Sequence, residues 1–572
     1  MKKRTKRILI IVVAIILAAG TIIYFIKDDI IEDQVRQKLA TMINENPQGY
    51  YVFEFDELDL RLLERKLILK GITIRPKPQA FDSLLAAESP VRALFELQLK
   101  RITLHGFDVE KFMSNNKIEV ASLVIQKPQM SYYFNPTKKK PDNKTLPLKE
   151  IFSDALQEAR LGRLTIEDAG FDIVDYTKDG FRITVKGLDI DLDSARMSRA
   201  TLEKILPFDY VDIKVSADGL MVKANEDFDI NSGYMSFIVS DKTIIVHDLQ
   251  INPRLSRKQF AKKYRVQKQW FALVVDSLRM NNLDIPTFMT TGIVHVQNLA
   301  IYKPNVALYK DKSKPMPPFK KKLLPASALR QIPWSLMVDT VAIHNGTVII
   351  NETSALTGQR SHLSFYQLNG NLYNFTNDSS RISQNPYMTL TASTRVMNQA
   401  PTTMKITVDL SSTLDYFEVE GRVGRVKADA FNKVLHPMMG VKVLNGLIHQ
   451  VIFSFSANDT LSTGGLDIDY ENLKIEVSEA RADSEKTQRK GFMTFAANTL
   501  VKTHNRPGNK NYLHGIIYTE RNQQKDIWPY LWHAIQSGLV SSMVPITNDK
   551  EKRQKQREVR QQTKVKRKKQ DR

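Results

Sequence analysis

The chain has 572 residues, of which 42% are hydrophobic and 25% charged, and its formal net charge is +21. This length exceeds what one hydrophobic core usually organises, so we expect two or more domains or an elongated array, while the composition excludes both a protein of many membrane spans and a wholly disordered chain. The absence of cysteine excludes disulfides, thiol nucleophiles and thiolate metal ligands.

The N-terminus predicts a membrane anchor. Ile8 to Ile26 is uncharged, and a helix of that length covers about 28 Å, close to the thickness of the hydrocarbon layer. A basic cluster precedes it and two aspartates follow it, which places the N-terminus in the cytoplasm. We therefore expect residues 1–27 to form a basic cytoplasmic start and a single transmembrane helix. A cleaved signal peptide is the alternative, but the apolar run is long for one.

Residues 28–49 predict an amphipathic connecting helix, because apolar side chains recur at every fourth position from Ile31 to Ile43. Beyond residue 50 the pattern changes to alternation with period two, as in Phe181, Ile183 and Val185. Such alternation, interrupted every 8–12 residues by glycine, Asn or Asp, is typical of antiparallel strands with one apolar and one wet face. We expect one β-rich region over residues 50–290 and a second over residues 291–526.

Each of these regions contains one copy of an internal repeat. In each copy a strand ends in Lys-Pro, a basic loop follows, and a new strand leads to a glycine. Pro128 and Pro304, like Gly170 and Gly346, are 176 residues apart. The spacing favours a duplication, with chance similarity of two meanders as the alternative. The loops contain Lys138–Lys140 and Lys320–Lys322, which are predicted either to contact anionic lipid headgroups or simply to be solvated.

Residues 527–546 predict an amphipathic, aromatic helix containing Trp528, Tyr530 and Trp532. Aromatic side chains grouped in this way suit either a helix at a membrane interface or a helix that caps the open end of a sheet. The tail of residues 547–572 is strongly basic and nearly free of apolar residues, which predicts disorder. Because the positive charge is concentrated at the two chain ends rather than on a folded face, no nucleic-acid partner is expected.

The sequence offers no support for catalysis. Its ten histidines are scattered without metal-ligand spacing, and it contains no nucleotide-binding loop, nucleophile elbow or kinase signature. We therefore expect a protein that is not an enzyme, with no catalytic residue, metal or cofactor. An envelope hydrolase assembled from distant strands ranks below the other interpretations.

This layout resembles the AsmA-like family of bacterial envelope proteins. The resemblance lies in the span 8–26, the helix 28–43, the strands near residues 51–55 and 67–72, and the block from Phe431 to Val477 with Gly465-Leu466-Asp467-Ile468-Asp469-Tyr470. It implies an inner-membrane protein with a cytoplasmic N-terminus and a periplasmic body that takes part in outer-membrane assembly. The strongly basic tail departs from the family pattern.

The resemblance also implies a mainly β fold: an elongated, curved, taco-like antiparallel sheet with few short helices and an apolar groove of the bridge-like lipid-transfer type. The expected partners are phospholipid, the inner membrane and envelope assembly proteins. The alternative is a structural scaffold whose apolar faces are all packed together. Candidate groove residues are Leu123, Ile125, Met130, Tyr132, Phe181, Ile183, Val185, Leu466, Ile468 and Tyr470; candidate membrane-interface residues are Trp528, Tyr530 and Trp532.

Overall fold

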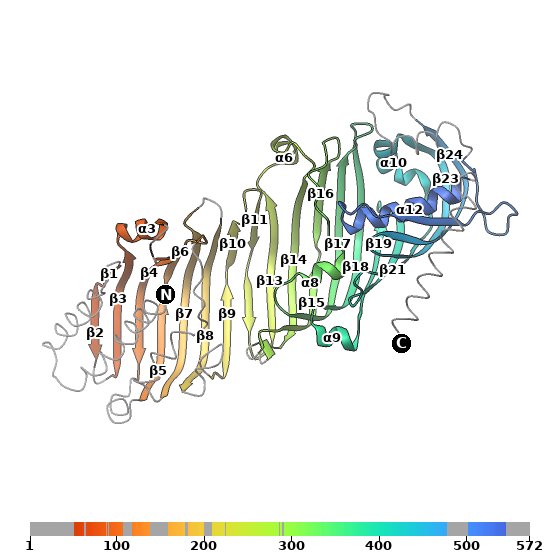
Figure 1. Ribbon diagram of the computed structural model, residues 1–572. Coiled ribbons are helices and arrows are strands. Elements are labelled where there is room, and N and C mark those ends of the chain that lie inside the picture. Colours follow the sequence, from red (N-terminus) through yellow and green to blue (C-terminus); the bar gives the residue numbers. More distant parts are fainter. Residues whose placement is uncertain are drawn as a thin grey trace. The chain divides into compact units, whose positions relative to one another are not determined.

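A computed structural model of the chain describes residues 51–61, 64–86, 89, 91–106, 117–137, 158–177, 181–198, 209–223, 225–284, 287–288, 291–477 and 501–544 (Figure 1). The predicted membrane anchor, the connecting helix, the loop Lys138–Lys140 and the basic tail lie outside these residues. Within them, no helix combines the length and the apolar character needed to cross a membrane.

The chain divides into two compact units. Unit 1 comprises Met1–Arg254 and Asn281–Gly292, and unit 2 comprises Leu255–Met280 and Ile293–Arg572. The elements of unit 1 are β1 (Tyr51–Glu54), β2 (Glu57–Arg61), β3 (Lys66–Pro76), α3 (Pro78–Leu85), β4 (Ala93–His105), β5 (Lys117–Gln126), β6 (Gln129–Phe134), β7 (Glu158–Asp175), β8 (Arg182–Ser198), β9 (Asp212–Ala217), β10 (Gly219–Lys223), β11 (Phe228–Ser232), β12 (Met235–Ile238) and β13 (Thr243–Pro253).

Unit 2 contains most of β14 (Gln269–Leu283), whose last residues belong to unit 1. Its other elements are α6 (Arg257–Lys263), β15 (Val294–Tyr302), β16 (Asn305–Asp311), α8 (Pro325–Arg330), β17 (Leu336–Thr353), β18 (Arg360–Thr376), α9 (Ser379–Gln384), β19 (Tyr387–Val396), β20 (Ala400–Asp409), β21 (Phe417–Val423), β22 (Val426–Lys427), η1 (Ala428–Phe431), α10 (Asn432–Met439), β23 (Val441–Ala457), β24 (Leu461–Val477), β25 (Gly515–Glu520) and α12 (Ile527–Met543). The prediction of a mainly β protein with few helices is therefore confirmed.

The prediction of purely antiparallel pairing is wrong, because the sheet is mixed. β5 and β6 are two parts of one strand line, antiparallel to β4 and parallel to β7. β15 and β16 are likewise parallel to β17. Parallel neighbours require a long connection that returns the chain to its starting end. Here the connections are residues 135–157 and 312–335, long enough for that return.

The two repeat copies pair their strands alike, with one shift in register. Ala93 lies opposite Phe134 in the first copy, and Gln269 lies opposite Lys310 in the second, which keeps the 176-residue spacing. In β7 and β17 the spacing becomes 177, however. The backbone N–H of Gly170 donates to Pro128 at 2.8 Å, whereas Thr347, not the neighbouring glycine, donates to Pro304 at 2.7 Å. The predicted equivalence of Gly170 and Gly346 is thus off by one residue.

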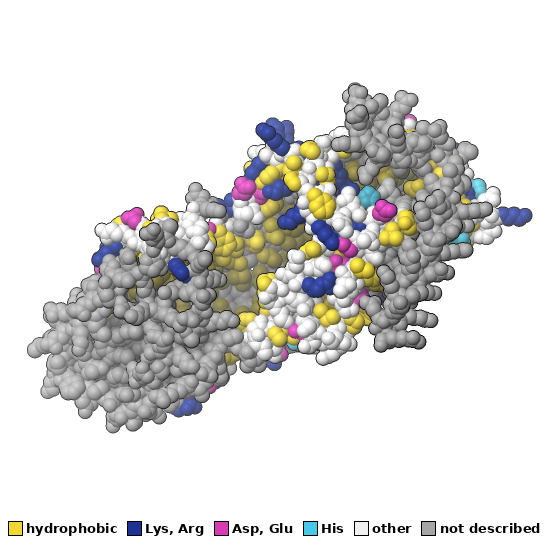
Figure 2. Space-filling model, viewed as in Figure 1, with side chains coloured by type: hydrophobic (Ala, Val, Ile, Leu, Met, Phe, Trp, Pro, Cys, Tyr) yellow, Lys and Arg dark blue, Asp and Glu magenta, His cyan; other side chains and the backbone are white. Residues whose placement is uncertain are grey.

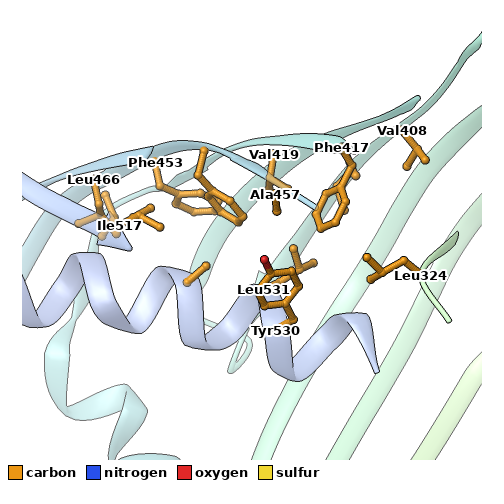
Figure 3. Packing of buried hydrophobic residues seen from close by; sticks show 14 of the residues in the cluster. Leu324, Val408, Phe417, Val419, Phe453, Ala457, Leu466, Ile517, Tyr530 and Leu531 are labelled. Atoms are coloured by element: carbon orange, nitrogen blue, oxygen red, sulfur yellow. The ribbon is translucent and has the colours of Figure 1, made fainter. Parts of the chain in front are cut away.

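Unit 2 has a closed hydrophobic core between its sheet and its helices. Phe417, Val419 and Ile468 are completely buried, and the ring of Tyr530 on α12 packs edge-on against Phe417 with centroids 6.3 Å apart. Figure 3 shows Tyr530 and Leu531 directed toward these strands, with Leu324 at the edge of the cluster. Burying a side chain of this size contributes about 1.5–3 kcal/mol, so the covering helices are a main source of stability for this unit.

This core predicts that unit 2 loses stability as the pH rises above about 10. Burial raises the pKa of Tyr470 and of Tyr530 above the usual range, and burial together with Asp467 raises the pKa of Tyr512 to about 12. Unfolded tyrosine ionises near pH 10, so above that pH the unfolded state binds fewer protons and becomes favoured. The contribution of these tyrosines to the free energy of unfolding is fully present below about pH 10 and is lost progressively above it.

Urea unfolding at several pH values, together with the ultraviolet absorbance of tyrosinate, measures this effect. We expect a fraction of the tyrosines to ionise only as the protein unfolds. If every tyrosine titrated near pH 10 while the protein stayed folded, the expectation would be wrong.

Candidate functional site

Unit 1 presents an apolar sheet face made of rows of side chains that lie opposite one another on successive strands. We call these rows the apolar face of unit 1. The first row is Phe95, Tyr132, Ile173, Ile183, Val222, Ile230 and Ile251. The second is Leu97, Met130, Phe171, Val185 and Leu220. The third is Ile102, Ile125, Ile166, Ile190, Val215, Phe237 and Ile244.

A line of irregularities keeps these rows on one side of the sheet. Lys127, Asp168 and Gly187 have φ between 51° and 56° and lie between the second and third rows, and Gly71 on β3 and Asp248 on β13, with φ of 62° and 50°, continue the line on these strands. At such a bulge one extra residue turns outward, so the alternation restarts one position later on the same face. Without it, residues five apart would point to opposite faces of a regular strand.

The opposite face of unit 1 is polar. Arg163 Nε donates to Asp191 at 2.9 Å, and Arg182 Nε donates to Asp172 at 3.1 Å, each pair bridging neighbouring strands. Exposed pairs of this kind contribute at most about 1 kcal/mol each, but they show which side of the sheet faces water. Unit 1 is thus an amphipathic sheet.

The apolar face of unit 1 differs in exposure from the part of the unit 2 sheet that lies under helices. Every side chain of the three rows is partly exposed. In unit 2 the row Met388, Val408, Phe417 is at most 5% exposed, because α8 and α12 pack on it. In unit 1 the helix α3 instead packs on Leu94, which points to the other side of β4.

The surface confirms that this face is accessible. Figure 2 shows hydrophobic side chains gathered in a hollow over β9 to β13. Burial raises the pKa of the Tyr132 phenol, although the row is partly open. An amphipathic sheet with a hollowed apolar face binds apolar matter without needing a charged or catalytic group.

Five of the ten predicted groove residues belong to this face. Ile125, Met130, Tyr132, Ile183 and Val185 lie in its rows. Leu123 lies in a neighbouring row opposite Leu104 and Leu164, and Phe181 packs edge-on against Phe134 at 6.3 Å just before β8 begins.

Three predicted groove residues belong to the closed core of unit 2 instead. Leu466, Ile468 and Tyr470 are at most 2% exposed, because β25 and α12 cover β24. They offer no open surface to a ligand, so they are removed from the groove set.

The predicted interface residues separate in the same way. Tyr530 is 3% exposed and packs into the core, whereas Trp528 and Trp532 are 58% and 40% exposed on the other side of α12. The helix therefore caps the sheet of unit 2 through Tyr530, which corrects the assignment of that residue to a membrane interface. The two tryptophans remain candidates.

Among the described residues, few side chains are arranged for metal binding or catalysis. They contain no group of His, Asp and Glu side chains arranged to hold a metal ion. His295 and His514 each contact one aspartate, Asp339 at 3.3 Å and Asp467 at 2.5 Å, and these pairs bridge neighbouring strands.

Comparison with known proteins leaves the chain without an assigned family. No protein-family model matches it, and no curated protein matches it. The functional argument therefore rests on the site itself.

Proposed function

We propose that this protein is an AsmA-like, membrane-anchored protein of the bacterial cell envelope whose unit 1 holds phospholipid acyl chains on its apolar face. The observation that supports the proposal most is the contrast in exposure: the rows of unit 1 are partly open, while the rows of unit 2 that lie under α8 and α12 are sealed. If the apolar rows served only to stabilise the fold, covering the rows of unit 1 as well would increase stability.

The energetics fit a lipid ligand. Each CH₂ group removed from water contributes about 0.8 kcal/mol, so an acyl chain laid across several rows gains enough to offset its loss of freedom. The polar headgroup stays in water at the edge of the sheet. Sliding along such rows involves no bond making or breaking, which agrees with a function in binding or transfer rather than catalysis.

In the proposed arrangement, residues 8–26 anchor the chain in the inner membrane with the N-terminus in the cytoplasm, and the body is periplasmic. Its partners are phospholipid and envelope assembly proteins, and its contribution is to outer-membrane assembly. The curved, groove-like form of the sheet belongs to this proposal, because bulged strands increase local twist and bending.

The test uses neighbouring residues of β10 that point to opposite faces. Val222 lies in the first row, whereas Met221 is 52% exposed on the polar side. A photo-crosslinking amino acid placed at either position in the full-length chain, in cells, should capture phospholipid at position 222 and not at position 221. Mass spectrometry of the adducts provides the measurement.

A matched pair of substitutions tests, without a crosslinker, whether lipid binds to the apolar face of unit 1. Val222→Glu introduces a charge into the apolar face and should lower the lipid recovered with the protein by about tenfold or more, since a charged group in apolar surroundings is costly. Met221→Glu should leave it unchanged. Equal lipid capture at both positions, or at neither, would refute the proposal.

The scaffold interpretation retains one supporting observation, the sealed core of unit 2. If position 222 captured protein adducts instead of lipid, the apolar face of unit 1 would be a protein-docking surface, and the scaffold function would be favoured.

A further inference from the structure

Unit 2 gathers four lysines and a histidine from three distant stretches of the chain. Lys310 lies at the end of β16 and Lys312 just after it, Lys322 lies in the following connection, Lys525 precedes α12, and His533 lies within α12. We call these five residues the cationic cluster. A backbone hydrogen bond joins two of these stretches: Lys322 N donates to Gln523 O at 2.8 Å.

The available carboxylates do not neutralise the cluster. Lys312 Nζ donates to Glu352 at 2.6 Å, and Lys322 Nζ lies 4.0 Å from Asp526. Lys310 faces Glu352 across the strand pair, but its ammonium forms no ion pair with any residue that the structure describes. Four lysines therefore share two carboxylates.

The remaining lysine, Lys525, lies beside a histidine rather than a carboxylate. Lys525 Nζ lies 3.5 Å from His533 Nε2, so protonation of the imidazole would bring two like charges together. Burial, and then the charge of Lys525, lowers the pKa of His533, which keeps the ring neutral near pH 7.

The lysines are also partly removed from water. Burial lowers the pKa of Lys310 and of Lys525, and the neighbouring Lys312 lowers both further, although Asp526 acts in the opposite direction on Lys310. Half-buried like charges are unfavourable, so their collection at one place requires a compensating partner. An anion supplies this compensation most directly.

The start of α12 adds to the attraction. This helix has 17 residues and begins at Ile527, two residues after Lys525, and its N-cap residue Asp526 forms no side-chain capping hydrogen bond. The first N–H groups of a helix and its dipole favour an anion. Lysine ammonium groups bind phosphate oxygens through short, charge-assisted hydrogen bonds.

We propose that the cationic cluster of unit 2 binds a phosphate group, either free or as the headgroup of an anionic phospholipid. This proposal rests on residues of unit 2 alone and stands whether or not the apolar face of unit 1 binds acyl chains. If the source is a lipid, the exposed Trp528 on the same helix supplies an interfacial contact beside the phosphate.

The experiment compares the full-length protein with two double variants of equal charge. Lys310→Gln/Lys525→Gln removes the two lysines that lack a carboxylate partner. The control, Lys405→Gln/Lys442→Gln, removes two exposed lysines on β20 and β23 of the same unit. The N-terminal segment and the basic tail are identical in all three proteins, so their own attraction to anions cancels in the comparison.

Two probes distinguish the source of the phosphate. Inorganic phosphate is titrated while the melting temperature is recorded, and vesicles of phosphatidylcholine with or without phosphatidic acid are tested by co-sedimentation. We expect the cluster variant to lose about tenfold or more in affinity and the control variant to keep it, since hydrogen bonds to charged groups are among the strongest. The cluster variant should melt no lower than the parent protein, because it loses buried charge.

The outcomes separate clearly. Binding of both probes, lost in the cluster variant, shows a general phosphate site, and binding of the phosphatidic acid vesicles alone assigns it to a lipid headgroup. Binding of neither probe, or equal binding by all three proteins, would overturn the proposal. The crosslinking test at Val222 reports on unit 1 and is independent of either result.

Discussion

Replacing Gly515 with alanine should destabilise unit 2 by about 3 kcal/mol, at the upper end of the range for overpacking a tight contact. A Cβ atom at this position of β25 would lie 2.3 Å from the carbonyl oxygen of Gly538 in α12 and 2.9 Å from that of Leu466. Both obstacles are backbone atoms, so no side chain can rotate away. The helix must move, and the core under Tyr530 opens with it.

Gly465 provides the matched control for this substitution. It lies beside Gly515 on the paired strand β24, yet the nearest atom to its added Cβ would be 3.9 Å away. Gly465→Ala should therefore be neutral or stabilise by about 0.4–1 kcal/mol, through the unfolded chain. Urea unfolding followed by tryptophan fluorescence suits both variants, because two of the four tryptophans lie on α12. Equal midpoints for the two variants would contradict the close approach of helix and strand.

The alternation of apolar residues was sufficient to predict strands and much of the apolar face of unit 1. The spacing of Ile183 and Val185 predicts that both lie on one apolar face of a strand. The sequence also contained the signal for the bulge line, because the alternation changes phase between Val185 and Leu188, where Gly187 has φ of 56°. A change of phase without an intervening turn indicates a bulge.

Burial was not predictable from the same pattern. Ile183 and Ile468 both alternate with polar neighbours, yet the first is partly exposed and the second completely buried. The difference comes from α12, a helix about sixty residues after Ile468, and alternation within a strand carries no information about what covers it. The parallel pairing of β7 was missed for a related reason: a period of two is the same in parallel and antiparallel strands.

The cationic cluster was only partly visible in the sequence. Lys320–Lys322 form a basic run in the sequence, but Lys321 forms an ion pair with Asp459 at 2.5 Å, and only Lys322 joins the cluster. Lys310 and Lys525 are separated by more than two hundred residues and belong to no run. Their approach depends on the return of the chain from β25 to α12 beside the end of β16.

Removing the carboxylate of Asp459 should cost unit 2 about 3–5 kcal/mol, the range measured when one partner of a buried ion pair is lost. The side chain of Arg521 is completely buried, and its Nη1 donates to Asp459. Its Nη2 donates to the carbonyl of Lys322 at 2.6 Å, whereas its Nε has no partner among the described residues. Asp459→Ala therefore leaves a buried positive charge without its counterion.

Arg521→Met should cost less, because it removes the buried charge itself while Asp459 keeps Lys321 and its partial access to water. The double variant Asp459→Ala/Arg521→Met should be no less stable than Asp459→Ala alone, because it no longer contains a buried arginine without a counterion. Urea unfolding of the four proteins forms a double-mutant cycle, and the coupling energy follows from it. Additive losses would show that the two groups do not depend on each other, and the ion pair would then contribute nothing to holding the connection before α12 against the sheet.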